Sequence, residues 1–280
     1  MHAFLLFHLL ACLEGSAPVN AVSNGEKAPE NSMLYMVSVQ NNNGHVCGGF
    51  LVSEDFVLTA AHCDNPKLTS VVLGTRNLKE ADNEKRRSIE ERYTHPKYES
   101  AGPSNDIMLL KFSGKVQWNN RVQPIQLPHS EIHMEDNEKC SVAGWGSTAT
   151  DHAGVDELRV VDVSVINQVC EQLWPGLPLN VICAGGYNTD KGFCEGDGGG
   201  PLVCDGIAVG IVSFGNSNCH YPDLPNVYTD VSKYLPWIKN ILIHSKSYEL
   251  CLSMQEKCCG VCQCDRNSFN HRGELGWHPL

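Results

Sequence analysis

The residues that could take part in chemistry lie in three short stretches of the sequence. His62 lies in the run Thr-Ala-Ala-His-Cys, and Asp106 lies in the run Asn-Asp-Ile-Met-Leu-Leu. The third stretch, Cys194–Pro201, contains Asp197 and three consecutive glycines but no serine or threonine. Histidine exchanges a proton near neutral pH, and a carboxylate can fix which ring nitrogen holds that proton. Each stretch alone also fits a purely structural role, so their combination and order decide the interpretation.

Together, and in this order, the three stretches resemble the trypsin/chymotrypsin family of serine proteases. In that family the third stretch is Gly-Asp-Ser-Gly-Gly-Pro, and its serine, the nucleophile, corresponds to Gly198 here. A glycine has no hydroxyl to attack a carbonyl, so the stretch that identifies the family also argues against its usual reaction. Three other stretches are similar to the granzyme and mast-cell protease branch: Leu73-Gly74, Asn77-Leu78-Lys79-Glu80 and His95-Pro96.

The resemblance implies a role for each catalytic position. The base would be His62, the carboxylate that orients this base would be Asp106, and Gly198 would be the vacant nucleophile position. The oxyanion hole, which stabilises negative charge on the carbonyl oxygen, would use the backbone N–H groups of Gly196 and Gly198. These two donors survive without the serine, because they do not depend on a side chain.

The resemblance also assigns a specificity pocket. Its floor would be Gly192, its walls Phe193 and Gly215, and a third lining position Asn226. Trypsin-like members have an aspartate at the floor, which pairs with a basic substrate side chain. Because Gly192 offers no charge, an arginine or lysine side chain would be buried without a partner. We therefore expect a pocket for neutral or acidic side chains.

A buried ion pair orders the cleft in active members of the family. In this chain it would join a freed N-terminus at Val22 to Asp197. Ser23 departs from the bulky apolar residue that is usual there, and no arginine or lysine directly precedes Val22. A trypsin-like activating cut is therefore not encoded. We expect residues 1–21 to be a signal peptide and propeptide, since a short apolar run at residues 3–12 is followed by small residues.

Short strand-like runs separated by turn residues predict an all-β fold. Valines alternate with polar residues over 161–165, as a half-buried strand requires, and residues 207–214 have the composition of a core strand. The apolar spacing over 234–242 predicts one helix near the end, with Ser232 as its N-cap. The resemblance implies two six-stranded antiparallel β-barrels, with this helix at the C-terminal end.

The domain organisation expected from the resemblance has three parts. Residues 1–21 precede a serine-protease-like domain over residues 22–244. Its N-terminal barrel would cover about 22–125 and its C-terminal barrel about 126–244, divided at a connector with prolines. Residues 245–280 form a cysteine-rich tail to which the resemblance does not extend.

Fourteen cysteines indicate an oxidising compartment, so we expect a secreted protein, either extracellular or in a secretory granule. The resemblance implies four disulfides: Cys47–Cys63, Cys140–Cys204, Cys170–Cys183 and Cys194–Cys219. The tail adds five cysteines, and this odd number leaves at least one free or paired with another chain. The spacing Cys259-x-x-Cys262-x-Cys264 also fits a zinc cluster, although disulfides are the commoner use of cysteine in such a compartment.

The charge and composition narrow the possible partners. A formal net charge of −11 argues against a nucleic acid, which needs a basic surface. No apolar run is long enough to span a membrane. Thr75 and Lys85 occupy the positions of calcium-binding glutamates in trypsins, so we expect no calcium site, and no other metal or cofactor is expected. The predicted partner is a protein or peptide.

Two function hypotheses follow from these residues. The first is a secreted, catalytically inactive protease homologue that binds proteins or peptides, since Glu195 at the cleft rim and Ser213 in its wall cannot replace the missing serine. The second is an active granzyme-like or chymase-like endopeptidase that cuts after non-basic residues. The second hypothesis requires that Gly198 be a sequence error or a rare variant.

Overall fold

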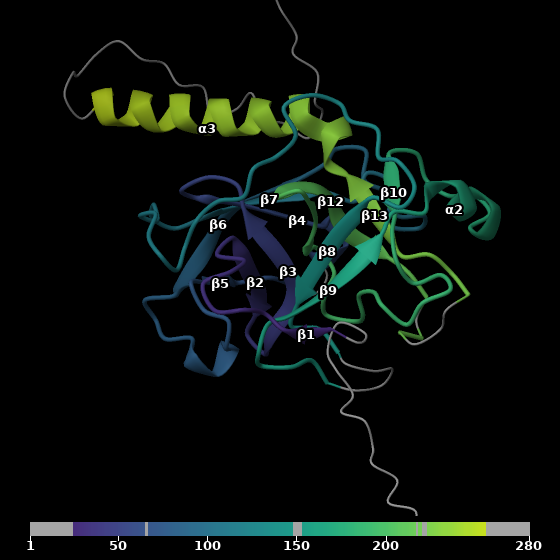
Figure 1. Ribbon diagram of the computed structural model, residues 1–280. Coiled ribbons are helices and arrows are strands. Elements are labelled where there is room, and N and C mark those ends of the chain that lie inside the picture. The colour runs from purple at the N-terminus through teal and green to yellow at the C-terminus, as the bar shows by residue number, and fades with distance from the viewer. Residues whose placement is uncertain (1–24, 65–66, 148–152, 217, 220–222, 256–280) are drawn as a thin grey trace, which may run out of the picture.

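The computed structural model describes residues 25–64, 67–147, 153–216, 218–219 and 223–255, which form two β-sheet units and a long C-terminal helix (Figure 1). The first unit is a closed barrel of six antiparallel strands in the order β2-β3-β4-β7-β6-β5. Its strands are β2 (Met36–Asn41), β3 (Gly44–Leu51), β4 (Phe56–Thr59), β5 (Ser70–Leu73), β6 (Arg86–Thr94) and β7 (Met108–Phe112). β4 and β7 are buried over their whole length, which explains why their sequences are mostly apolar instead of alternating.

The second unit is a seven-stranded sheet in the order β1-β9-β8-β11-β12-β13-β10. Its strands are β1 (Glu26–Lys27), β8 (Lys139–Gly144), β9 (Arg159–Ser164), β10 (Val181–Cys183), β11 (Pro201–Cys204), β12 (Ile207–Phe214) and β13 (Val227–Asp230). A β-bridge between Val165 and Ala184 joins the ends of β9 and β10, so the sheet curls back toward a barrel. The alternation at residues 161–165 and the core strand at 207–214 are both confirmed.

The trypsin/chymotrypsin-like two-barrel class with a C-terminal helix is therefore confirmed, with one correction to the strand count. β1 comes from the N-terminal part of the chain and adds a seventh strand to the second sheet by pairing with β9. Its two residues are exposed and have no alternating pattern, so only this long-range pairing identifies them as a strand.

The C-terminal helix α3 (Leu235–Gln255) follows a 3-10 turn, η3 (Val231–Tyr234), and buries Ile238 and Ile241 in the apolar core of the first barrel. The prediction that Ser232 is the N-cap is wrong. The side chain of Asp230 accepts a hydrogen bond from the Ser232 backbone N–H at 2.9 Å, because the 3-10 turn begins before the α-helix. α3 continues past His244, so the expected domain boundary falls inside this helix.

A second helix, α2 (Asn167–Leu173), was not predicted. It begins after Ile166, which makes no capping hydrogen bond through its side chain, so the usual sequence signal for a helix start is missing. Two further 3-10 turns lie in the first unit, η1 (Ala61–Asp64) and η2 (Leu78–Glu80). Residues 1–24 and 256–280 lie outside the described residues, and so do Val22 and four of the tail cysteines.

Candidate active site

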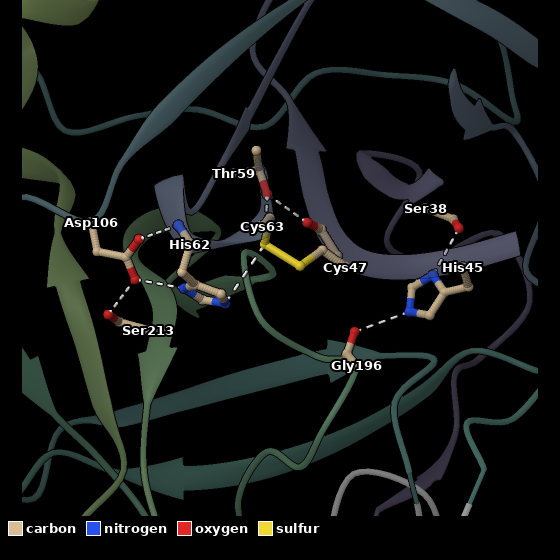
Figure 2. The surroundings of a disulfide bond; sticks show 10 residues. Ser38, His45, Cys47, Thr59, His62, Cys63, Asp106, Gly196 and Ser213 are labelled. Carbon is tan, nitrogen blue, oxygen red and sulfur yellow. Dashed lines mark hydrogen bonds and ion pairs between the residues drawn. A yellow bond between two sulfur atoms is a disulfide. The ribbon is translucent and has the colours of Figure 1, made fainter. Parts of the chain in front are cut away.

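The candidate site lies between the two units, where His62 and Asp106 of the barrel meet Ser213 of the second sheet (Figure 2). His62 lies in η1, directly after β4, and Asp106 lies shortly before β7. β4 and β7 are antiparallel neighbours, with Thr59 opposite Met108. The end of β4 and the start of β7 therefore meet at the same edge of the barrel, which brings together two residues 44 positions apart.

The Asp106 carboxylate is fully buried and holds His62 through two hydrogen bonds. Its Oδ1 accepts from the His62 backbone N–H at 2.8 Å, and its Oδ2 lies 2.7 Å from His62 Nδ1. Burial alone would raise the pKa of Asp106, but the contacts with His62 and the Ser213 hydroxyl together lower it below its usual value. The ionised carboxylate fixes a proton on Nδ1 and leaves Nε2 directed toward Gly198.

Two hydroxyl residues of the second sheet also hold Asp106, and sequence reasoning did not assign them this part. Ser213 donates its hydroxyl to Asp106 Oδ2 at 2.6 Å, and Thr229 donates its hydroxyl to the Asp106 carbonyl at 2.9 Å. The partners are 107 and 123 positions apart, so no local pattern could have revealed these contacts. The hydroxyl of Ser213 is thereby committed to Asp106 and is not placed as a nucleophile.

Gly198 leaves a vacancy that the imidazole of His62 partly fills. An ideal Cβ on Gly198 would lie 2.6 Å from His62 Nε2, 3.2 Å from its Cε1 and 3.7 Å from Sγ of Cys47. The ring also rests near the Cys47–Cys63 disulfide, with Nε2 3.7 Å from Sγ of Cys63 (Figure 2). Gly198 therefore lies at the histidine, as the sequence placed it, but offers that histidine no proton to remove.

The two expected oxyanion residues lie on the same loop as Gly198. Gly196 has φ +94°, a conformation that favours glycine, and its carbonyl accepts a hydrogen bond from His45 Nε2 at 2.9 Å. His45 Nδ1 in turn lies 2.8 Å from the Ser38 hydroxyl (Figure 2). Burial lowers the pKa of His45, so its ring is neutral at pH 7 and donates from Nε2. This chain of contacts fixes the backbone at Gly196. His45 and Gly196 are 151 positions apart, so no local pattern predicts their contact.

Asp197 lies on the same loop, between Gly196 and Gly198, and its side chain is fully buried. Its Oδ1 accepts from the Gly146 backbone N–H at 2.8 Å, and its Oδ2 accepts from the Cys194 backbone N–H at 2.9 Å. Burial raises the pKa of Asp197 to about 7, although the two backbone donors pull it down. Among the described residues no cationic group pairs with Asp197. Val22, its expected partner, lies outside them.

The four expected pocket residues lie together, and side chains fill much of the space between them. An ideal Cβ on Gly192 would lie 1.9 Å from Asn226 Oδ1, and one on Gly215 would lie 2.7 Å from Asn226 Nδ2. The Phe193 ring lies 3.3 Å from the same point on Gly215 and packs edge-on against Tyr228. The Oδ1 atom of Asn226 is buried and has no hydrogen-bond partner in the described structure.

Four disulfides join the pairs that the resemblance implies: Cys47–Cys63, Cys140–Cys204, Cys170–Cys183 and Cys194–Cys219. Donor atoms of Cys47, His62 and Cys63 lie within 4.8 Å of one another, but both sulfurs are oxidised and cannot bind a metal as thiolates.

Lys85 lies in the loop where trypsins have calcium-binding glutamates. Its ammonium group donates to the Glu80 carbonyl at 2.8 Å. It also donates to Asp82 Oδ2 at 2.9 Å.

Within the described ranges, no helix is long and apolar enough to cross a bilayer.

A two-barrel β fold with a histidine–aspartate pair between its units defines a chymotrypsin-like protein. The chain belongs to the trypsin family, since the family model described as Trypsin matches residues 22–238.

Individual relatives agree with this assignment. Duodenase-1 of Bos taurus is 38% identical over 248 residues, which cover 85% of this chain and 96% of that protein. Granzyme B of Rattus norvegicus is 36% identical over 246 residues, which cover 85% of this chain and 98% of that protein. The solved structure of neuropsin, a serine protease expressed in the limbic system of mouse brain, matches with a TM-score of 0.72 and 32% identity. That match covers 78% of this chain and 99% of the neuropsin chain.

Proposed function

We propose that this chain is a secreted, catalytically inactive homologue of trypsin-like serine proteases that binds proteins or peptides in its cleft. The observation behind this proposal is Gly198, which stands beside His62 Nε2 without a hydroxyl. The base and its carboxylate have no attacking group to activate. In other proteases that lose a member of the triad, the remaining groups give only roughly 10³–10⁴-fold catalysis over water. Enzymes usually accelerate reactions by about 10⁶-fold or more, so the remaining activity would be negligible.

Several features support a binding role for the cleft. His62, Asp106 and the backbone at Gly196 are held by hydrogen bonds to both units, so these parts of the cleft keep their positions without the serine. The four disulfides fit an oxidising compartment, which supports secretion. A negative net charge of −11 favours a protein or peptide over a nucleic acid as partner.

The test of this function is recovery of intact ligands. The purified protein is mixed with a diverse peptide library, the complex is separated by size, and the bound peptides are identified by mass spectrometry. We expect intact peptides and no cleavage products. The matched control is Gly198→Leu, whose side chain would fill the vacancy beside His62 and should abolish binding without loss of secondary structure. New peptide ends that form with the unchanged protein would overturn the proposal.

A second candidate is an active endopeptidase that cuts after non-basic residues. The observation that favours it is the intact His62–Asp106 pair, with Nδ1 and Oδ2 2.7 Å apart. This candidate requires a serine codon at position 198. Sequencing that codon in independent genomic and transcript samples decides between the two: serine would support the active enzyme, and glycine would support the binding protein.

A further inference from the structure

The turn that joins β2 to β3 carries an asparagine followed directly by a glycine. Asn43 is exposed, and its side-chain amide has no hydrogen-bond partner among the described residues. Its backbone N–H is held by Asn41 Oδ1 at 2.7 Å. Asparagine side chains are short enough to reach the backbone close to them in the sequence. The Cγ atom of Asn43, which is the electrophilic carbon of this amide, is therefore open to attack by the neighbouring backbone.

Gly44, the next residue, places no side chain in the way of that attack. It has φ +117°, a conformation that favours glycine, and an ideal Cβ on it would meet nothing within 4 Å. The pairing of β2 with β3 ends where Asn41 lies opposite Gly44. Only this last pair of the ladder has to open before the Gly44 nitrogen can turn toward Asn43, and the ends of elements open most easily.

We propose that Asn43 is a site of spontaneous modification, at which the side-chain amide becomes a carboxylate without the help of an enzyme. The Gly44 nitrogen forms a bond to Asn43 Cγ, and the bond from Cγ to Nδ2 breaks. Ammonia leaves with the proton that the Gly44 nitrogen loses, and a succinimide ring remains. Water then opens the ring at either of its carbonyls and gives aspartate or isoaspartate at position 43. The only co-reactant is water, which reaches an exposed turn.

Both products change the strand pair beside this turn. Each adds a negative charge to a chain whose formal net charge is −11. Isoaspartate also adds a carbon to the backbone between β2 and β3, and the length of a hairpin turn sets the register of its strands. His45, opposite Gln40 in the same ladder, carries the ring that donates to the Gly196 carbonyl. The modification therefore acts on the strand that reaches the loop of the cleft.

Other asparagines of the chain provide internal controls. Asn24 is the only other asparagine followed by glycine, and it lies outside the described residues. Asn42 is exposed in the same turn but is followed by Asn43. Asn137 is also exposed and is followed by Glu138. A side chain on the following residue hinders closure of the ring, so both controls should react more slowly than Asn43.

The test is a time course of the folded, full-length protein at neutral and at alkaline pH. Peptide mapping by mass spectrometry measures the fraction of each asparagine that has gained the mass of one deamidation, and isoaspartate is identified by enzymatic methylation. We expect Asn43 to react about tenfold or more faster than Asn42 and Asn137. The rate should rise with pH, since the attacking nitrogen must lose its proton.

Variants connect the reaction to the two named residues. Asn43→Gln keeps an amide but requires a larger ring, so the mass gain at this position should disappear. Gly44→Ala should slow the reaction about tenfold or more, because alanine disfavours a positive φ and its methyl group hinders ring closure. Asn42→Gln is the matched control in the same turn and should leave the rate at Asn43 unchanged. Circular dichroism checks that each variant is folded.

Two results would overturn this inference. In the first, Asn43 of the unchanged protein reacts no faster than Asn42 and Asn137. In the second, Asn43 stays intact in the folded protein while a synthetic peptide with the sequence of residues 37–46 is modified under the same conditions. That result would show that the folded turn holds the Gly44 nitrogen away from the side chain.

Discussion

Nε2 of His62 lies 2.6 Å from the point where a Cβ of residue 198 would stand. The other nitrogen of the same ring lies 2.7 Å from the Asp106 carboxylate. The imidazole that we propose as the base is thus held in place by Asp106, and its ring partly takes the space beside residue 198 where an attacking group would stand. The structural relationship between these residues explains why the cleft can be ordered and still lack the group that would react.

Asp197 should make stability depend on pH in a way that reveals the state of the N-terminus. Burial raises its pKa to about 7, whereas a carboxyl in an unfolded chain has a pKa near about 4. The folded chain binds this proton more tightly, so its free energy of unfolding falls as pH rises from about 4 to about 7. A Val22 ammonium paired with Asp197 would lower that pKa and remove the loss. The thermal unfolding temperature of a chain processed to Val22 should therefore fall less as the pH is raised than that of a chain that keeps the residues before Val22.

Other groups also make the free energy of unfolding depend on pH. Burial lowers the pKa of His45, so its contribution to stability is lost as pH falls. This contribution is the same in the chain processed to Val22 and in the chain that keeps the preceding residues, so it cancels when their pH profiles are compared. If the two chains have the same pH profile, Val22 does not pair with Asp197.

Asn226 should limit what enters the specificity pocket, because its side chain lies between Gly192 and Gly215. Asn226→Gly would open this space and remove the buried Oδ1 atom that has no hydrogen-bond partner in the described structure. We expect the variant to bind indole about tenfold or more tightly than the unchanged protein, since burying an aromatic ring contributes about 1.5–3 kcal/mol. The measurement is a titration followed by calorimetry or NMR. Asn31→Gly, at an exposed position with φ 58°, is the matched control, and an equal gain there would contradict the pocket assignment.

α3 should stabilise the fold through its buried face. Ile238 is 1% exposed and packs in the core of the first barrel, whereas Ile243 on the same helix is 61% exposed. Ile238→Ala should lower the free energy of unfolding by about 2–5 kcal/mol, because it leaves a cavity. Ile243→Ala should change it by no more than about 0.5 kcal/mol. Denaturant unfolding measures both, and equal effects would show that the helix does not pack through this face.

Much of the fold could be predicted from the sequence, because its signals are local. The alternation at residues 161–165 marks β9, and the apolar run at 207–214 marks β12. The helical spacing over residues 234–242 marks α3. Motifs around His62 and Asp106 identified the family, and these short runs lie at the ends of paired strands. The family resemblance carried by these motifs therefore placed the two residues at one site.

The features that were missed depend on contacts between distant residues. Ser213 and Thr229 hold Asp106 from the second sheet, and β1 is a strand only because β9 pairs with it. The start of α2 lacks a capping side chain, so no residue marks it. The position of the His62 ring in the Gly198 vacancy also follows from packing, since it depends on Asp106 and on the nearby disulfide.

Gly198→Ser should restore chemistry if the rest of the site is competent. The φ angle of Gly198 is not left-handed, so the backbone accepts a side chain. The added Cβ requires the His62 ring to withdraw, and that side chain is 35% exposed and has room to move. Gly198→Ala adds the same carbon without the hydroxyl and is the matched control. Both variants are compared after processing of the N-terminus to Val22.

Labelling by a fluorophosphonate probe tests the central claim most directly, because the probe reacts with an activated serine. Each protein is incubated with the probe, digested, and analysed by mass spectrometry to locate any labelled residue. We expect no label on the unchanged protein or on Gly198→Ala, and a label on residue 198 of Gly198→Ser. Labelling of any cleft residue in the unchanged protein would contradict the account, since it would show a nucleophile that Gly198 cannot supply.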